Sequence, residues 1–260
     1  MATGTRSATR WEPIADDATL PSGRLRWRTA LREASFIAAA ALLYSLVRGL
    51  TDDRVDAAFA NAERVISLER WLGIFVEADL QRVALRGDGV IDVVNAIYIA
   101  YWPIVFGTLL WLLVRHPAVY PLYRNALLAS GALSLAVFAL YPLAPPRFLP
   151  EHGFVDTIAR ESEGYRSFNA SALVNEYAAM PSLHFGWVLL LAIAVATLVR
   201  SRIVRASAVV TPVVMLAAIV LTGNHFIIDG IVGGVVVLAG LWTALLLRRR
   251  FGGGAHSGLW

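Results

Sequence analysis

The sequence predicts an all-α membrane protein, a polytopic bundle of six transmembrane helices with an added interfacial amphipathic helical segment. Composition is the first reason: 57% of the 260 residues are hydrophobic and only 16% are charged, which is too apolar for a water-facing globule. The second is that the apolar residues form six runs close to the length of helix that crosses a bilayer core roughly 30 Å thick. Backbone groups in lipid must be hydrogen-bonded internally, so runs without strand-like alternation are expected to be helices.

These runs divide the chain into three parts. Residues 1–23 mix charged residues and proline without the apolar core of a signal peptide, so we expect a disordered cytoplasmic tail. Residues 24–250 form the predicted membrane domain, and the glycine-rich residues 251–260 form a flexible C-terminal tail. The six expected spans are residues 34–50, 90–114, 126–141, 183–199, 203–221 and 226–247.

Residues 52–88, between the first two spans, carry apolar side chains at helical spacing, for example Val55, Phe59, Ala62 and Ile66. This pattern favours one or two amphipathic helices that lie on the outer leaflet, with Trp71 at the depth of the headgroups. The alternative is a functional one, in which the segment forms a lip that guides a lipid substrate into the bundle.

The charged residues exclude several classes of protein. All 23 basic residues are arginines, and they are scattered around the apolar blocks, so no nucleic acid is expected as a partner. The chain has no cysteine, which excludes disulfides, a thiolate nucleophile and a zinc–thiolate site. Any chemistry must therefore come from histidine, aspartate, arginine and hydroxyl groups.

The arginines also predict the orientation, because basic residues stay on the cytoplasmic side of a membrane. With both termini cytoplasmic, 14 arginines lie inside, 8 lie in outer loops, and Arg48 lies near the outer end of the first span. We therefore expect a multi-pass protein of the cell membrane. Residues 141–147, 180–184 and 223–229, which hold polar residues at span ends, would all face the extracytoplasmic side.

Ionisable residues at span ends are costly enough to suggest a functional site. His225 and Asp229 are four positions apart and share a helix face, so the aspartate can accept the Nδ1 proton and leave Nε2 as a nucleophile or base. The structural alternative is a histidine at a helix start and an aspartate that bonds a neighbouring group.

His184 follows Pro181 and Ser182, a pattern typical of a helix start with a serine N-cap and free N–H groups that suit an anion. Arg147, after two prolines, is suited to hold phosphate oxygens bidentately. A capped interfacial helix and a snorkelling arginine explain each feature separately. Their combination with the His225 pair favours phosphoryl transfer through a phosphohistidine.

At these residues the sequence resembles the type 2 phosphatidic acid phosphatase superfamily over about residues 90–247. The second motif of that family appears as Pro181-Ser182-Leu183-His184, and the third keeps the spacing of its histidine and aspartate. The chain departs from the family pattern in having no lysine and in placing Phe148 after the first-motif arginine. Leu183 replaces glycine, and the Ser-Arg pair of the third motif falls on Ala218-Ile219. The motifs look more like the inositolphosphotransferase branch, which includes inositol phosphorylceramide synthases.

The resemblance implies a mechanism in which His225 is the nucleophile, Asp229 orients it and His184 protonates the leaving oxygen. Arg147, Ser182 and backbone amides near Leu183 would hold the phosphate. It implies no metal and no cofactor.

Other groups must replace the missing family cations. Asn224 is a candidate for the phosphate. Further candidates for the headgroup are the outer-loop residues Arg166 and Asn169 and a stripe of Asp92, Asn95 and Tyr98 at helical spacing. The alternative for this stripe is hydrogen bonding between helices.

We therefore expect a lipid phosphatase or phosphotransferase that acts on a polyprenyl phosphate, phosphatidic acid or an inositol phospholipid. Its partners would be a membrane lipid and, for transfer, an alcohol acceptor such as inositol. The rival hypothesis is a non-enzymatic lipid-phosphate carrier or proton-coupled transporter that uses the same His225, Asp229 and Arg147.

Overall fold

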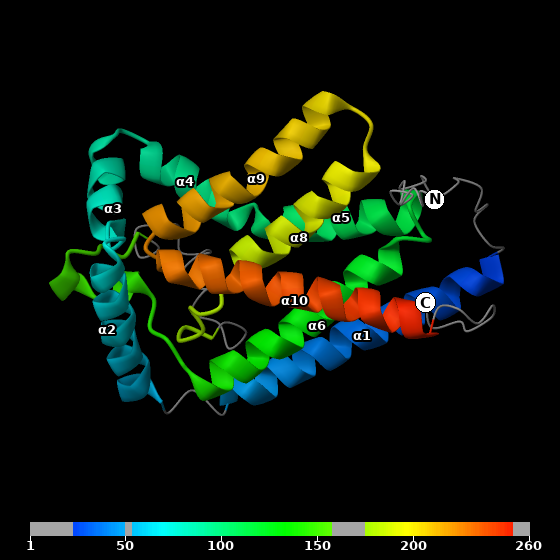
Figure 1. Cartoon of the computed structure of the whole chain (residues 1–260), viewed down its shortest axis with the longest axis horizontal. Coiled ribbons are helices and arrows are strands. Elements are labelled where there is room, and N and C mark those ends of the chain that lie inside the picture. The colour runs from blue at the N-terminus through cyan, green and yellow to red at the C-terminus, as the bar shows by residue number, and fades with distance from the viewer. Residues whose placement is uncertain (1–22, 50–53, 158–174, 252–260) are drawn as a thin grey trace, which may run out of the picture.

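The computed structural model describes residues 23–49, 54–157 and 175–251, and its regular elements are all helical (Figure 1). The all-α prediction is thus confirmed, whereas the predicted tails, apart from the residues next to the membrane domain, lie outside the described residues. The elements are α1 Gly23–Gly49, α2 Val55–Leu72, α3 Glu77–Arg86, α4 Val90–Ile99, α5 Tyr101–Arg115, α6 Tyr120–Leu140, η1 Pro146–Phe148, η2 Pro150–His152, α8 Leu183–Leu198, α9 Arg202–Leu221 and α10 Ile227–Phe251.

Four helical stretches are long and apolar enough to cross a membrane, judged by length and composition. They correspond to the second, third, fifth and sixth expected spans, and they are Val90–Arg115, Tyr120–Leu140, Arg202–Leu221 and Ile227–Arg250. The fourth expected span is α8, an apolar helix of 16 residues. The first lies within α1, which is not among these four stretches, so the count of six spans stays a prediction.

The second expected span consists of two helices, α4 and α5, separated at Ala100. Pro103 explains the interruption, because proline has no N–H to donate to the carbonyl four positions before it. The break lies between Tyr98 and Tyr101. These two residues are the ones that reach the histidine of α8, as described below.

Two hydrophobic clusters hold the described residues together. The larger cluster lies among the long helices α5, α6, α8, α9 and α10. The smaller joins α2 and α3 to the loop after α6 and to Phe226, at the left-hand end of the molecule in Figure 1. The apolar stripe of α2, which includes Ala62 and Ile66, is therefore buried against protein, whereas Trp71 is 81% exposed. The amphipathic pattern is present in two helices, and their position on a membrane stays a prediction.

Glycine allows α8 and α10 to cross closely near their N-terminal ends. A Cβ at Gly186 would lie 2.8 Å from the carbonyl oxygen of Gly233, and a Cβ at Gly233 would collide with the backbone of Ser182. Small residues at helix crossings are typical of membrane bundles, where they let backbones approach. The crossing brings the starts of α8 and α10 together.

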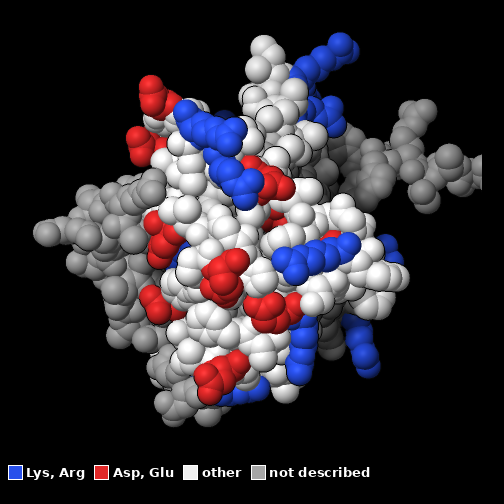
Figure 2. Space-filling model, turned by 90° about the vertical axis from the view of Figure 1, so that its left-hand side faces the viewer, with Lys and Arg blue, Asp and Glu red and all other residues white. Residues whose placement is uncertain are grey.

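Charge is distributed unequally along the bundle. Among the described residues, every aspartate and glutamate except Glu33 lies toward the end formed by α2, α3 and the start of α10, where red and blue side chains mix (Figure 2). The opposite end carries arginines in the turn between α8 and α9, in the first turn of α9 and at the end of α10, including Arg200, Arg205 and Arg249. The two ends of the bundle therefore differ in the sign of their charge.

The glycine crossing gives a testable prediction. Gly233→Ala should lower the melting temperature in detergent, because the new methyl group collides with the Ser182 backbone and such overpacking costs roughly 1–3 kcal/mol. Tryptophan fluorescence during heating measures the change. Gly107→Ala is the matched control, since a Cβ there meets nothing within 4 Å. Equal melting temperatures for the two variants would contradict the close approach.

Candidate active site

His225 lies in the turn between α9 and α10 and is only 6% exposed. Its Nδ1 atom is 2.7 Å from the carbonyl oxygen of Ala179 and 3.5 Å from Oδ2 of Asp229. A carbonyl can only accept a hydrogen bond, so Nδ1 carries the proton and donates it, and Nε2 keeps its lone pair. The prediction that Asp229 is the acceptor is incomplete, because the backbone carbonyl is the nearer partner.

Asp229 has a second task at the start of α10. Its Oδ2 accepts a hydrogen bond of 2.8 Å from the backbone N–H of Phe226, and the side chain is fully buried. Its Oδ1 is also buried and receives no hydrogen bond from any described donor. The aspartate thus caps the helix start and faces the imidazole, which combines the functional and the structural interpretations of this residue.

His184 lies in the first turn of α8 and is held between aromatic rings. The ring of Tyr98 stacks on it at a centroid distance of 4.4 Å, and the ring of Tyr101 lies 4.2 Å away. The centroids of His184 and His225 are 5.7 Å apart. The two histidines are therefore neighbours, although they belong to different helices.

Ser182 connects the two helix starts. Its hydroxyl oxygen accepts a hydrogen bond of 3.4 Å from the N–H of Phe185, as expected of an N-cap. Its own N–H donates to the carbonyl oxygen of Asp229 at 2.9 Å. The cap thus occupies the hydroxyl, while the N–H groups of the first turn, beginning at Leu183, have no acceptor within the helix. Such groups suit an anion.

Arg147 in η1 reaches the segment that contains His225. Its backbone N–H donates to the carbonyl oxygen of Gly223 at 2.8 Å, and its guanidinium donates to the side-chain oxygen of Asn224. The amide of Asn224 in turn donates to the hydroxyl of Thr222 at 2.7 Å. The carboxylate of Asp156 is farther away, with its Oδ2 atom 3.9 Å from Nε of Arg147. Asn224 therefore orients the guanidinium without cancelling its charge.

Gly223 makes this contact possible. Its φ of +69° lies in the left-handed region that glycine adopts easily. A Cβ there would also lie 2.8 Å from the buried amide nitrogen of Gln81. The chain can therefore pass between Arg147 and Gln81 only because this residue has no side chain.

The predicted stripe on α4 divides in the structure. Asn95 is buried and accepts a bond of 3.4 Å from the hydroxyl of Thr157, which fits the alternative of structural hydrogen bonding. Tyr98 stacks on His184, and Asp92 is exposed. Arg166 and Asn169 lie outside the described residues, so their placement stays a prediction.

Several groups at the site were not predicted from the sequence. Tyr101 follows Tyr98 at helical spacing, which was an available signal, whereas the carbonyl of Ala179 leaves no trace in the sequence. Glu69 and Glu77 are both fully buried and accept hydrogen bonds from the first N–H groups of α10. Burial raises the pKa of Glu69 to about 9, and the neighbouring carboxyl of Glu77 adds to the rise.

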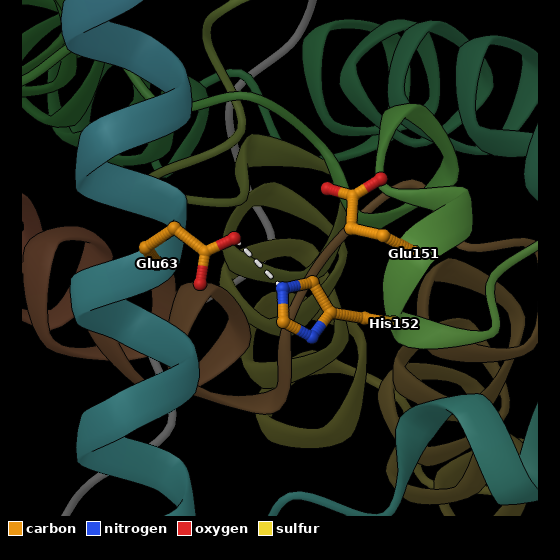
Figure 3. A group of neighbouring side chains, drawn as sticks. All are labelled: Glu63, Glu151 and His152. Atoms are coloured by element: carbon orange, nitrogen blue, oxygen red, sulfur yellow. Dashed lines mark hydrogen bonds and ion pairs between the residues drawn. The ribbon is translucent and has the colours of Figure 1, made fainter.

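Glu63, Glu151 and His152 form a group whose ligand atoms lie within 4.8 Å of one another (Figure 3). Arg70 lies 3.3 Å from Nδ1 of His152, and arginine can only donate, so Nδ1 accepts. Nε2 therefore carries the proton and donates to Glu63 at 2.7 Å. Arg70 and Glu63 thus use both ring nitrogens of His152, which leaves no imidazole lone pair for a metal.

The fold and the site define a helical membrane protein with two neighbouring imidazoles at one end of its bundle. Residues 63–243 match the PAP2 superfamily, and the chain belongs to that family. Its members are generally phosphatases, which supports an enzyme of that kind. The match includes most of α2 and all of α3, so it begins earlier than the predicted residues 90–247. Neither the curated proteins nor the solved structures contain a match.

The Arg147–Asn224 contact gives a prediction. Asn224→Asp keeps an oxygen acceptor for the guanidinium but adds a negative charge, which should weaken inhibition by inorganic phosphate roughly tenfold. The inhibition constant measured with the purified protein tests this. Asp79→Asn, on an exposed pair with Arg82, is the control for a change of one charge. An unaltered constant in Asn224→Asp would show that Arg147 does not bind the phosphate.

Proposed function

We propose that the protein is an integral-membrane lipid phosphatase or phosphotransferase that works through a phosphohistidine at the extracytoplasmic face. The observation that carries the proposal is the pair of imidazoles, whose ring centroids are 5.7 Å apart. One of them, His225, donates its Nδ1 proton to a carbonyl oxygen. One ring can then present Nε2 to phosphorus while the other lies on the side of the leaving group. Membership of the PAP2 superfamily supports the same class of reaction.

The proposed reaction has two steps. Nε2 of His225 attacks phosphorus, the bond to the leaving oxygen breaks, and His184 donates a proton to that oxygen. Water or an acceptor alcohol then attacks the phosphohistidine, gives its proton to His184 and releases His225. Throughout, the Ala179 carbonyl and Asp229 stabilise the positive imidazole ring. Arg147 and the first amides of α8 stabilise the oxygens of the phosphoryl group.

The tyrosines give His184 a fixed orientation for this task. Tyr98 and Tyr101 contact the ring, so it can rotate little without losing both contacts. A general acid must lie within hydrogen-bond reach of the leaving oxygen, which makes orientation the first requirement.

A lipid substrate is supported by the place of the site. The two histidines lie where apolar helices begin. A lipid whose phosphate binds between them therefore has its chain beside the membrane-facing surface of these helices. The arginines at the opposite end of the bundle support a cytoplasmic location for that end and an extracytoplasmic location for the site. The Pro-Ser-Leu-His motif supports the inositolphosphotransferase-like branch, with a polyprenyl phosphate or phosphatidic acid as the other substrates to test.

The first experiment is a rapid quench with radiolabelled lipid phosphate. Wild-type protein should give an acid-labile phosphoenzyme, and His225→Ala should give none. His184→Ala should lose roughly 100- to 10,000-fold in turnover, because it lacks the general acid. The loss should be much smaller with an aryl phosphate, whose leaving group departs without protonation.

The folding of each variant is checked by its melting temperature. Wild-type turnover by either histidine variant would refute the role given to that residue. Movement of the lipid between vesicle leaflets without a phosphoenzyme would instead identify a carrier.

The second experiment separates hydrolysis from transfer. The purified protein is incubated with phosphatidic acid, a polyprenyl phosphate or an inositol phospholipid, with and without an acceptor. Free inositol serves as acceptor for the first two substrates, and a lipid alcohol such as ceramide for the third. A transferase should form an acceptor-linked product, because the acceptor competes with water for the same phosphohistidine. Release of inorganic phosphate from the lipid phosphates alone, unchanged by acceptor, would assign a phosphatase and exclude the inositolphosphotransferase-like branch.

A further inference from the structure

Two buried carboxyls outside the three motif segments hold the helix that follows His225. Oε1 of Glu69 on α2 accepts a hydrogen bond of 2.9 Å from the N–H of Ile228. Oε1 of Glu77 on α3 accepts one of 3.0 Å from the N–H of Ile227. Both glutamates are fully buried. Negative or polar acceptors at a helix start satisfy N–H groups that have no partner within the helix.

The hydrogen bonds show how the two carboxyls differ. Glu77 accepts a bond with each oxygen, because its Oε2 receives the N–H of Val76 at 2.9 Å. Oε2 of Glu69 is buried and receives no hydrogen bond from any described donor. A buried carboxylate oxygen without a donor is unfavourable. A proton on that oxygen removes the problem, because the new O–H can donate to the carboxylate of Glu77, the hydrogen-bond partner of this side chain. Of these two glutamates only Glu69 has a buried oxygen without a donor, so the proton of the pair belongs on Glu69 and Glu77 is the carboxylate.

The charges around Glu69 favour the same assignment. The charged groups that act on it are the carboxyls of Glu77 on α3 and Asp229 on α10, both of which disfavour a further negative charge, whereas the hydrogen bond from Ile228 favours one. His225 lies on the other side of Asp229, 3.5 Å from it. Burial is the largest cause of the raised pKa of Glu69, about 9, so the acid keeps its proton at neutral pH.

We propose that Glu69 and Glu77 are positioning residues for His225 and act as one acid–carboxylate pair that holds the first turn of α10. The catalytic part of this inference rests on the proposed function. The first turn also fixes α8, because the carbonyl of Asp229 accepts the N–H of Ser182. Displacement of this turn therefore moves both imidazoles.

The test compares two substitutions at one position. Glu69→Gln keeps an oxygen for Ile228 and places an N–H where the acid has its O–H, so it should keep kcat within about threefold of wild type. Glu69→Ala removes both groups and should lower kcat at least tenfold with little change in KM, because the histidines are misplaced while the lipid-binding surface remains. Asp79→Asn on α3 is the control and should be unchanged. Equal kcat values for Glu69→Gln and Glu69→Ala would overturn the proposal.

The second readout is independent of catalysis. In wild type the folded pKa of Glu69, about 9, lies above the ordinary value of 4.5. The folded state therefore holds a proton that the unfolded state loses, and the wild type should lose stability as pH rises from about 5 to about 9. The effect is at most about tenfold in the unfolding constant for each pH unit. Glu69→Gln has no proton to lose, so its melting temperature should rise relative to wild type across this range.

The two readouts separate the two proposals. If the difference in melting temperature between wild type and Glu69→Gln stays constant from pH 5 to pH 9, Glu69 is not a protonated acid and the proposed pair is overturned. A difference that grows with pH supports the pair even if the His225→Ala experiment refutes the phosphohistidine. The melting comparison needs no folded Glu69→Ala protein.

Discussion

The start of α10 is the constraint on which the site depends. Three consecutive N–H groups, those of Phe226, Ile227 and Ile228, each bind a different carboxyl group. The three acids come from α10 itself, α3 and α2, so segments far apart in the sequence meet at one helix end. Ionisable groups are costly to bury. These carboxyl groups are tolerated because the N–H groups at the helix start provide hydrogen-bond donors and a favourable dipole. His225 directly precedes this turn, so its position follows from that of the carboxyls.

The rest of the site follows from the way this turn contacts its neighbours. Glycines at the crossing of α8 and α10 let the Ser182 backbone reach Asp229, which brings His184 into place. The break between α4 and α5 then supplies the two tyrosines that enclose this ring. Backbone contacts between α8 and α10 and the carboxyls at the start of α10 together set the distance between the two imidazoles.

The sequence predicted the helical fold and the most visible residues of the site. Hydropathy predicted the outer bounds of α4–α5, α8 and α9 to within one residue, whereas α6 and α1 begin well before the expected spans. It missed the break at Ala100, because Pro103 lies inside an otherwise continuous apolar run. The spacing of His225 and Asp229 placed both on one face, whereas the carbonyl of Ala179 has no side-chain signature. Glu69 did leave a signal, since it continues the buried stripe of α2 after Ala62 and Ile66. An acid on the apolar face of a helix is a sign of a specific buried partner.

The carbonyl of Ala179 affects how the site can vary. The hydrogen on Nδ1 of His225 is held by the path of the main chain, so any residue at position 179 that preserves this path offers the same acceptor. A substitution at position 179 is therefore less damaging than a substitution of a side chain that accepts the same hydrogen bond. The imidazole tautomer is thus encoded in the conformation of a loop, and it would change only if that loop were rebuilt.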